Sequence, residues 1–255
     1  MTWSTGLLGF AAGLLISVAT SPVGVSGAVF LLPVQVSVLG VPSPAVTPTN
    51  LLFNVVAGPG ALTRYRKTGR LGGPLTRLLI MGTVPGVVVG AVVRVFAVPG
   101  PEVFRLLVAG LLLPLGIWLC RPARDSAPRR PPSRRTTAVL ALGVGIAGGI
   151  YGIGGGSLLG PILVGRGMPV ATVAPAALAS TFVTSIVGAV TYALLSLTTS
   201  GAVAPEWLLG LACGLGGLVG GYLGARLQPL LPDTVLRLLL GVLAIAIGTL
   251  YVVQA

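Results

Sequence analysis

Glycine is the residue type in this sequence whose spacing is best suited to chemistry. Seven of the fourteen residues from Gly148 to Pro161 are glycines. Each glycine inside a helix costs about 1 kcal/mol relative to alanine, so this density predicts a break in a helix. The N–H groups freed at a break carry partial positive charge, and glycine allows a ligand to approach closely. The pattern therefore indicates a site that binds an oxyanion through the main chain.

A second, shorter glycine motif, Gly24-Val25-Ser26-Gly27-Ala28, lies early in the chain, and hydroxyl or amide side chains follow both motifs. We predict that the two motifs and these side chains form one substrate-binding site near the middle of a membrane. The predicted members are Gly24, Ser26, Gly27, Thr49, Asn50, Asn54, Gly152, Gly154, Gly155, Gly156, Ser157, Ser180, Thr181 and Thr184. Small residues also let membrane helices pack closely, so packing is the alternative role for each of them.

Other kinds of chemistry lack the residues that they need. The chain has no histidine, and its two cysteines, Cys120 and Cys213, stand apart in apolar sequence. Its four carboxylates lie outside the apolar runs, where they provide no buried acid or base. We therefore expect a protein that is not an enzyme, with no catalytic residue, no metal and no cofactor.

Composition places the glycine motifs in a lipid bilayer. Hydrophobic residues make up 54% of the 255 residues and charged residues 8%, and the mean hydropathy is +1.01. A soluble globule needs more polar surface than this. The net charge of +12 comes from 16 Lys and Arg against 4 Asp and Glu, a balance that nucleic-acid-binding proteins share. Here the cations lie in the short breaks between apolar runs, as in cytoplasmic loops of membrane proteins, so we expect no nucleic-acid partner.

The apolar runs predict an all-α polytopic integral membrane protein with two homologous halves. Residues 6–40 would be about 52 Å long as one helix, against about 30 Å for the hydrocarbon core, so this run must break near Gly24. Further spans are expected at residues 45–63, 71–98 and 103–120. The segment 121–135 is rich in proline and arginine, which predicts a basic cytoplasmic linker. The predicted membrane repeats are therefore residues 1–120 and 136–255.

Glycines and prolines recur in the second half at nearly constant spacing. The matches are Gly24 with Gly152, Gly27 with Gly155 and Pro33 with Pro161 at 128, and Gly86 with Gly217, Gly90 with Gly221 and Arg105 with Arg237 at 131 or 132. If each broken run crosses the membrane twice, each half has five segments and the halves are inverted, with both termini outside. If it crosses once, the halves are parallel with four spans each. The basic loop 64–70 has an uncharged counterpart at 196–205, which favours inversion.

Two arginines lie close to the ends of predicted spans. Arg94 and Arg226 occupy related places in the two halves. Long cationic side chains at such places reach the lipid headgroups, and this is the role we expect. The alternative is that they attract anions towards the pathway.

Several motifs together resemble those of the sulfite exporter TauE/SafE family, also described as the 4-toluene sulfonate uptake permease family. They are Gly148 to Pro161 followed by Ala179-Ser180-Thr181 and Gly188 to Tyr192, Thr47 to Leu51 leading to Tyr65 to Gly69, and Gly216 to Arg226. The resemblance covers nearly the whole chain. It is weaker in the first half, where Gly24 to Ala28 replace a fuller glycine run.

The resemblance implies a multi-pass transporter in the bacterial cytoplasmic membrane. Its implied substrates are small sulfur-containing or organic anions such as sulfite, sulfonates or sulfoacetate, and its partners are such an anion and the lipid bilayer. The alternative is a membrane-embedded structural or regulatory subunit that conducts nothing. The particular anion, the direction of transport, the coupling ion and a homo-oligomeric state stay open.

Overall fold

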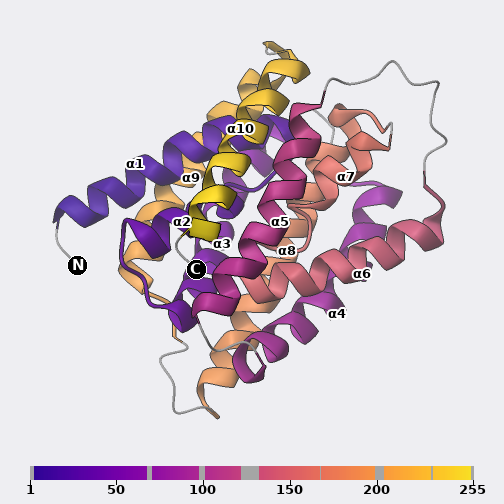
Figure 1. The fold of residues 1–255 in the computed structure, drawn as a ribbon. Helices are drawn as coiled ribbons and strands as arrows, with labels where there is room; N and C mark the ends of the chain where they lie inside the picture. The colour runs from indigo at the N-terminus through magenta and orange to yellow at the C-terminus, as the bar shows by residue number, and fades with distance from the viewer. Residues whose placement is uncertain are drawn as a thin grey trace.

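The computed structural model describes residues 3–67, 71–97, 101–121, 132–166, 168–198, 204–230 and 232–253. Every regular element in these ranges is helical, as the sequence predicts. Up to residue 120 the elements are α1 (Trp3–Thr20), the 3-10 turn η1 (Ser21–Val23), α2 (Ala28–Ser37), α3 (Ser43–Lys67), α4 (Pro74–Phe96) and α5 (Pro101–Cys120). After residue 132 they are α6 (Arg134–Tyr151), α7 (Leu159–Gly165), α8 (Val170–Ser196), α9 (Trp207–Leu227), the 3-10 turn η2 (Gln228–Leu230) and α10 (Asp233–Val253). In both parts a long helix and a short helix precede three long ones (Figure 1).

Both broken runs turn at a glycine in the left-handed conformation. Gly24, which follows η1, has φ of 76°, and Gly152, which ends α6, has φ of 71°. Space is also short at both positions. A Cβ on Gly24 would lie 2.5 Å from the Cα of Ala174, and a Cβ on Gly152 would overlap the carbonyl oxygen of Thr47. The breaks therefore require glycine for both backbone conformation and close approach.

The helices pack across the sequence rather than mainly with their neighbours in the chain. α1 packs on α9, α4 packs on α6 and α8, α3 packs on α8 and α9, and α5 packs on α10 (Figure 1). α3 and α8 run in opposite directions, because Leu51 lies against Gly188 whereas Gly58, further along α3, lies against the earlier residue Phe182. α3 and α8, which hold the same place in the two element orders, are thus antiparallel to each other.

Glycines let the backbones of two helix pairs come into contact. In α4, a Cβ on Gly90 would overlap the carbonyl oxygen of Ile146 in α6, and in α9 a Cβ on Gly224 would lie 2.7 Å from the carbonyl oxygen of Val18 in α1. Val18 and Ile146 differ by 128 positions, the spacing of the two glycine breaks. The contacts therefore match Gly90 with Gly224, at a spacing of 134. The sequence-based match of Gly90 with Gly221 is wrong by three residues, because Gly221 faces α3.

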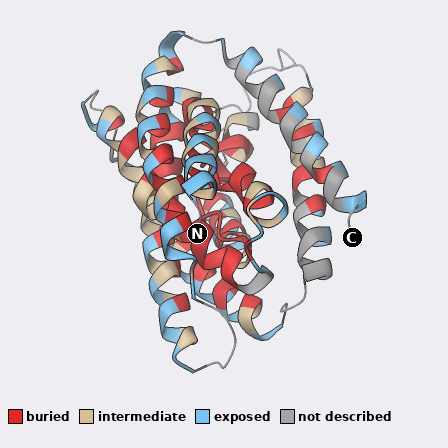
Figure 2. Ribbon diagram, turned by 90° about the vertical axis from the view of Figure 1, so that its left-hand side faces the viewer, coloured by how far each residue is buried: buried red, intermediate tan, exposed pale blue. Residues whose placement is uncertain are grey.

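The outer surface of the bundle is apolar. Among the described residues, four helices are long and apolar enough to cross a membrane: Trp3–Val23, Pro74–Phe96, Val170–Ser196 and Trp207–Leu230. Large apolar side chains stand exposed on them, with Trp3 92% and Met81 76% exposed. Buried residues gather inside the bundle, while exposed ones line its outward faces (Figure 2). Lipid is the solvent that suits such a surface, so the chain is an all-α polytopic membrane protein.

Candidate functional site

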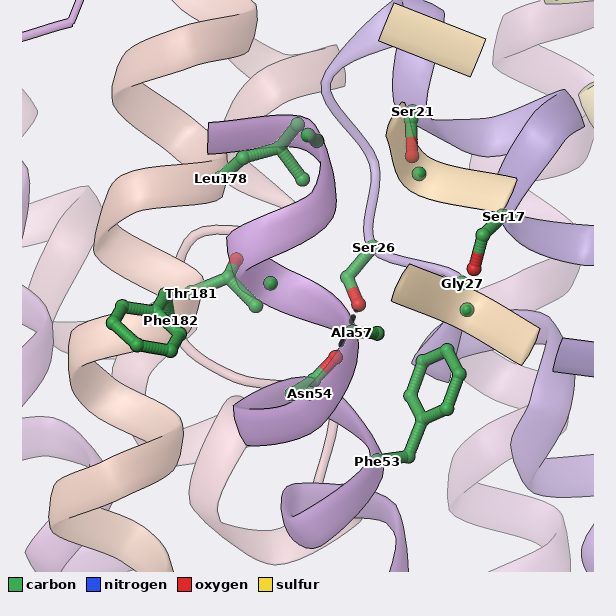
Figure 3. Close-up of a pocket in the computed structure, with 14 residues that line it drawn as sticks. Ser17, Ser21, Ser26, Gly27, Phe53, Asn54, Ala57, Leu178, Thr181 and Phe182 are labelled. Carbon is green, nitrogen blue, oxygen red and sulfur yellow. Dashed lines mark hydrogen bonds between the residues drawn. The ribbon is translucent and has the colours of Figure 1, made fainter. Parts of the chain in front are cut away.

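A small polar cavity lies beside the first glycine break. It has a volume of about 30 Å³ and is bordered by α1, η1, α3, α8 and α9. Its polar lining consists of Ser17, Ser21, Ser26, Asn54 and Thr181, which converge from these elements (Figure 3). We call this space the polar cavity. Hydroxyl and amide groups can donate hydrogen bonds to an anion, and none of the lining side chains is charged.

Asn54 connects the polar cavity with the second glycine break. The Ser26 hydroxyl donates a hydrogen bond to Asn54 Oδ1 (Figure 3), and Ser26 Oγ accepts one from the Ala28 main-chain N–H at 3.2 Å. Asn54 Nδ2 donates to the carbonyl oxygen of Gly152 at 3.4 Å. One amide side chain on α3 therefore holds both breaks together.

Part of the predicted site lines the polar cavity. The predicted members that do so are Ser26, Gly27, Asn54 and Thr181. Ser17 and Ser21, which are both buried, also line the cavity and are not among the predicted members. They lie four residues apart at the end of an apolar run, and this spacing on one helical face was the available signal.

Two other predicted residues tie α3 to neighbouring segments and do not line the polar cavity. Thr49 Oγ1 donates to the carbonyl oxygen of Ala45 at 2.6 Å and accepts from the main-chain N–H of Glu206 at 2.8 Å. Asn50 Nδ2 donates to the carbonyl oxygen of Ala28 at 2.9 Å. Thr49 thereby fixes the start of α9, and Asn50 fixes the start of α2.

The second glycine segment is tightly packed against α4 and α8. The Gly155 N–H donates to Thr184 Oγ1 at 2.9 Å, and a Cβ on Gly155 would lie 2.5 Å from the Cβ of Thr83. The hydroxyls of Ser180 and Thr83 are 2.9 Å apart. The remaining predicted members of the segment are also buried: Gly152, Gly154, Gly156 and Ser157. In this conformation the Gly155 main-chain donor, predicted to bind an oxyanion, is bonded within the protein.

A polar cluster holds the end of α6. The Tyr192 hydroxyl donates to the carbonyl oxygen of Gly149 at 2.9 Å, and Thr47 Oγ1 donates to that of Ile150 at 3.2 Å. Arg94 Nε in turn donates to Thr47 Oγ1 at 3.4 Å. We call Thr47, Arg94 and Tyr192 the α6 cluster. It satisfies carbonyl groups in the last turn of α6, which have no partner within the helix.

A similar cluster holds the end of the first broken run. The Tyr65 hydroxyl donates to the carbonyl oxygen of Ser21 at 3.3 Å, and Gln228 Nε2 donates to that of Pro22 at 2.7 Å. We call Tyr65 and Gln228 the η1 cluster. The η1 cluster lies beside the basic ends of α3 and α9. The α6 cluster contains Arg94 in the last turn of α4, at the end of that helix remote from Arg66 and Lys67, which precede α4. The polar cavity borders the η1 cluster through Ser21.

Arg94 does not reach the lipid headgroups in the way that its place near a span end predicts. Its side chain is only 3% exposed and lies within the α6 cluster, whereas Arg226 is exposed as expected. The spacing of 134 between α4 and α9 matches Arg94 with Gln228 and not with Arg226. One cluster therefore holds a buried cation where the other holds a neutral amide.

The glycine-broken helices around a cavity lined by buried polar side chains define a class: a polytopic α-helical membrane protein with broken helices, a feature that many transporters have. The model of the family described as sulfite exporter TauE/SafE matches residues 8–251. The chain belongs to this family of membrane transporters, which export sulfur-containing anions, and the resemblance drawn from the motifs is confirmed. No curated protein and no solved structure matches the chain.

Proposed function

We propose that the chain carries a small sulfur-containing or organic anion, such as sulfite, a sulfonate or sulfoacetate, across the bacterial cytoplasmic membrane. The polar cavity is the binding site in this proposal. The observation that carries it is the Ser26–Asn54 pair, whose side chains line the cavity and join the two glycine breaks. An entering oxyanion can accept hydrogen bonds from the Ser26 hydroxyl, the Asn54 amide and the Thr181 hydroxyl once these turn towards it.

Neutral donors suit a transported anion. A buried guanidinium or ammonium would bind the anion strongly and also hold it, whereas transport requires release on the other side. In our proposal α2 supplies the fixed positive field, because its first turn begins at Gly27 on the cavity wall and the N-terminal end of a helix attracts negative charge.

The size of the polar cavity makes the described conformation an occluded one in this proposal. A volume of about 30 Å³ holds about two water molecules. Sulfite, with a sulfur and three oxygens, needs more room, so binding requires the bordering helices to separate. The ring of Phe182 on α8 lies against Gly58 on α3 and also lines the cavity. We therefore expect α3 and α8 to separate at this contact when the anion binds.

The two clusters are proposed as the closures of an alternating-access pathway. We assign residues 1–120 and 136–255 to two inverted repeats joined by the basic linker 121–135. The antiparallel packing of α3 and α8 supports inversion over parallel halves. Inversion also puts the η1 cluster on the cytoplasmic side and the α6 cluster on the outer side, with both termini outside.

Flux into proteoliposomes tests the proposal. The purified protein should give saturable uptake of ³⁵S-labelled sulfite, sulfonate or sulfoacetate. Asn54→Ala removes a donor from the cavity and the link between the breaks, and Ser26→Ala removes a second donor, so each should lower uptake at least tenfold at a limiting anion concentration. Ser196→Ala is the matched control, because that partly exposed side chain bonds only within its own helix end.

The outcome separates transport from a purely structural role. Loss of uptake in both cavity variants, with the control unchanged and all three proteins monodisperse, supports the site. Folded protein that moves and binds none of the labelled anions would contradict transport and leave the non-conducting subunit as the explanation.

A further inference from the structure

An open groove lies on the outer surface between about one turn of α3 and one turn of α9. Its volume is about 300 Å³, ten times that of the polar cavity, and its walls are almost entirely apolar. Pro59 and Thr63 contribute from α3, and Leu218, Tyr222 and Leu223 contribute from α9. It lies on the surface that faces lipid, apart from the substrate site, and we call it the lipid groove.

The two helices that form the lipid groove run parallel and in fixed register. Leu52 packs on Gly210 and Val56 on Gly214, and Gly60 approaches the backbone of Leu218. The two residues of each pair are 158 positions apart in the sequence. A residue of α3 therefore lies at the same height along the groove as the residue of α9 that comes 158 positions later.

Basic residues close one end of the lipid groove. Arg66 and Lys67 lie in the last turn of α3, and Arg226 lies in the last turn of α9, with all three exposed. By the register, Lys67 is level with residue 225, about 1.5 Å along the axis from Arg226. Arg66 and Lys67 follow Thr63 by three and four positions, so these cations continue the face of α3 that lines the groove.

The same geometry holds on α9. Arg226 follows Tyr222 by four positions and Leu223 by three, which puts it on the groove face one turn further on. Neither α3 nor α9 contains an aspartate or glutamate, so the positive charge at this end is not neutralised from its own helices. The surface thus joins an apolar channel to a cationic end within one turn of helix.

We propose that the lipid groove is a binding site for an anionic phospholipid of the leaflet on the basic side. One acyl chain lies in the apolar channel against Leu218 and Leu223, and the phosphate lies between Lys67 and Arg226, with Arg66 beside it. The ligand must be a molecule that is apolar along most of its length and negatively charged at one end. An anionic phospholipid has this form, whereas a protein helix or a second copy of the chain would leave the three cations without a partner in the apolar contact.

Native mass spectrometry of the full chain in detergent tests this site. Phosphatidylglycerol is the probe, and phosphatidylcholine of the same acyl chains is the comparison. We expect the wild-type chain to retain one phosphatidylglycerol in preference to phosphatidylcholine. Each cation near a membrane surface contributes about fivefold to affinity, so the double variant Lys67→Gln, Arg226→Gln should bind phosphatidylglycerol about 30-fold more weakly.

Two further variants separate the charge from the channel. Arg77→Gln is the matched control, since Arg77 is also an exposed arginine but lies on α4 and does not line the groove. The affinity of this variant for phosphatidylglycerol should equal that of the wild-type chain. Thr63→Trp keeps every charge and fills the channel, and it should weaken binding at least tenfold. Glycerol phosphate, which lacks acyl chains, should not compete.

Contrary results would overturn the proposal. Unchanged phosphatidylglycerol binding in the double variant would remove the phosphate contact, and unchanged binding in Thr63→Trp would remove the acyl chain from the groove. Equal affinity for phosphatidylcholine, or competition by glycerol phosphate, would show a different kind of site.

Discussion

Removing one tyrosine hydroxyl from each cluster should open the pathway on opposite sides. In the α6 cluster, Tyr192→Phe leaves the carbonyl oxygen of Gly149 without its partner at 2.9 Å. In the η1 cluster, Tyr65→Phe removes the hydroxyl donor at 3.3 Å from the carbonyl oxygen of Ser21, which keeps the Gly24 N–H at 3.1 Å. Both rings are buried and remain in place, with each tyrosine 1% exposed, so the substitutions change hydrogen bonding more than packing.

The expected size follows from the hydrogen bonds that are lost. A buried neutral hydrogen bond stabilises by about 1 kcal/mol, and a buried carbonyl left unpaired costs up to about 3 kcal/mol. Opening lets water reach the freed carbonyl, so Tyr192→Phe should shift the closed-to-open equilibrium by about 1 to 2 kcal/mol, or about 5- to 30-fold. Tyr65→Phe should give a shift at or below the lower end of this range, because its contact is longer and the Ser21 oxygen keeps the Gly24 N–H.

Sided thiol labelling measures the shift. The reporter is Ser17→Cys in the polar cavity, in a chain where Cys120 and Cys213 are replaced, and the reagent is a membrane-impermeant thiosulfonate. Tyr192→Phe should speed labelling from the outside only, and Tyr65→Phe should speed it from the cytoplasmic side only. Acceleration from the same side in both variants, or no change in either, would refute the assignment of the two clusters as opposite closures.

Three other outcomes are expected. Arg94→Ala removes a buried cationic side chain and should lower the free energy of unfolding in detergent by about 2 to 4 kcal/mol. Arg226→Ala, at an exposed position, should change that free energy by less than about 0.5 kcal/mol. Gly90→Leu should prevent accumulation of folded protein, because its Cβ would overlap α6, while Gly143→Leu, which has open space around it, should accumulate normally on a size-exclusion profile. Leu197→Cys, at the exposed end of α8, should react with an impermeant thiol reagent added outside intact cells, and reaction only from the cytoplasm would contradict inverted halves.

The helical class and the positions of both breaks could be predicted from sequence because their causes are local. Glycine density is costly in a helix, and a run too long for the bilayer must turn. The second break follows the same logic at Gly152, where the left-handed backbone suits no other residue type well. The register between α4 and α9 could not be fixed in this way. α9 carries glycines at 216, 217, 220, 221 and 224, so several alignments with Gly90 look equally good until the contacts of each glycine are known.

The site was harder to predict because it depends on which helix faces meet. Thr49 and Asn54 are five residues apart on α3, yet Asn54 faces the polar cavity and Thr49 bonds to the segment before α9. Ser17 and Ser21 lie in a long apolar run, where two separate hydroxyl side chains do not by themselves indicate a binding site. The burial of Arg94 was equally invisible, since a residue near the end of a span faces either the headgroups or a neighbouring helix.

The most direct test of the account is to locate a bound anion in the protein. Crystals grown with selenite, a heavier analogue of sulfite, would reveal the anion as a peak in an anomalous difference map. We expect that peak in the polar cavity, within hydrogen-bonding distance of Ser26 and Asn54. A peak at another buried position, with the Ser26–Asn54 hydrogen bond intact, would contradict it.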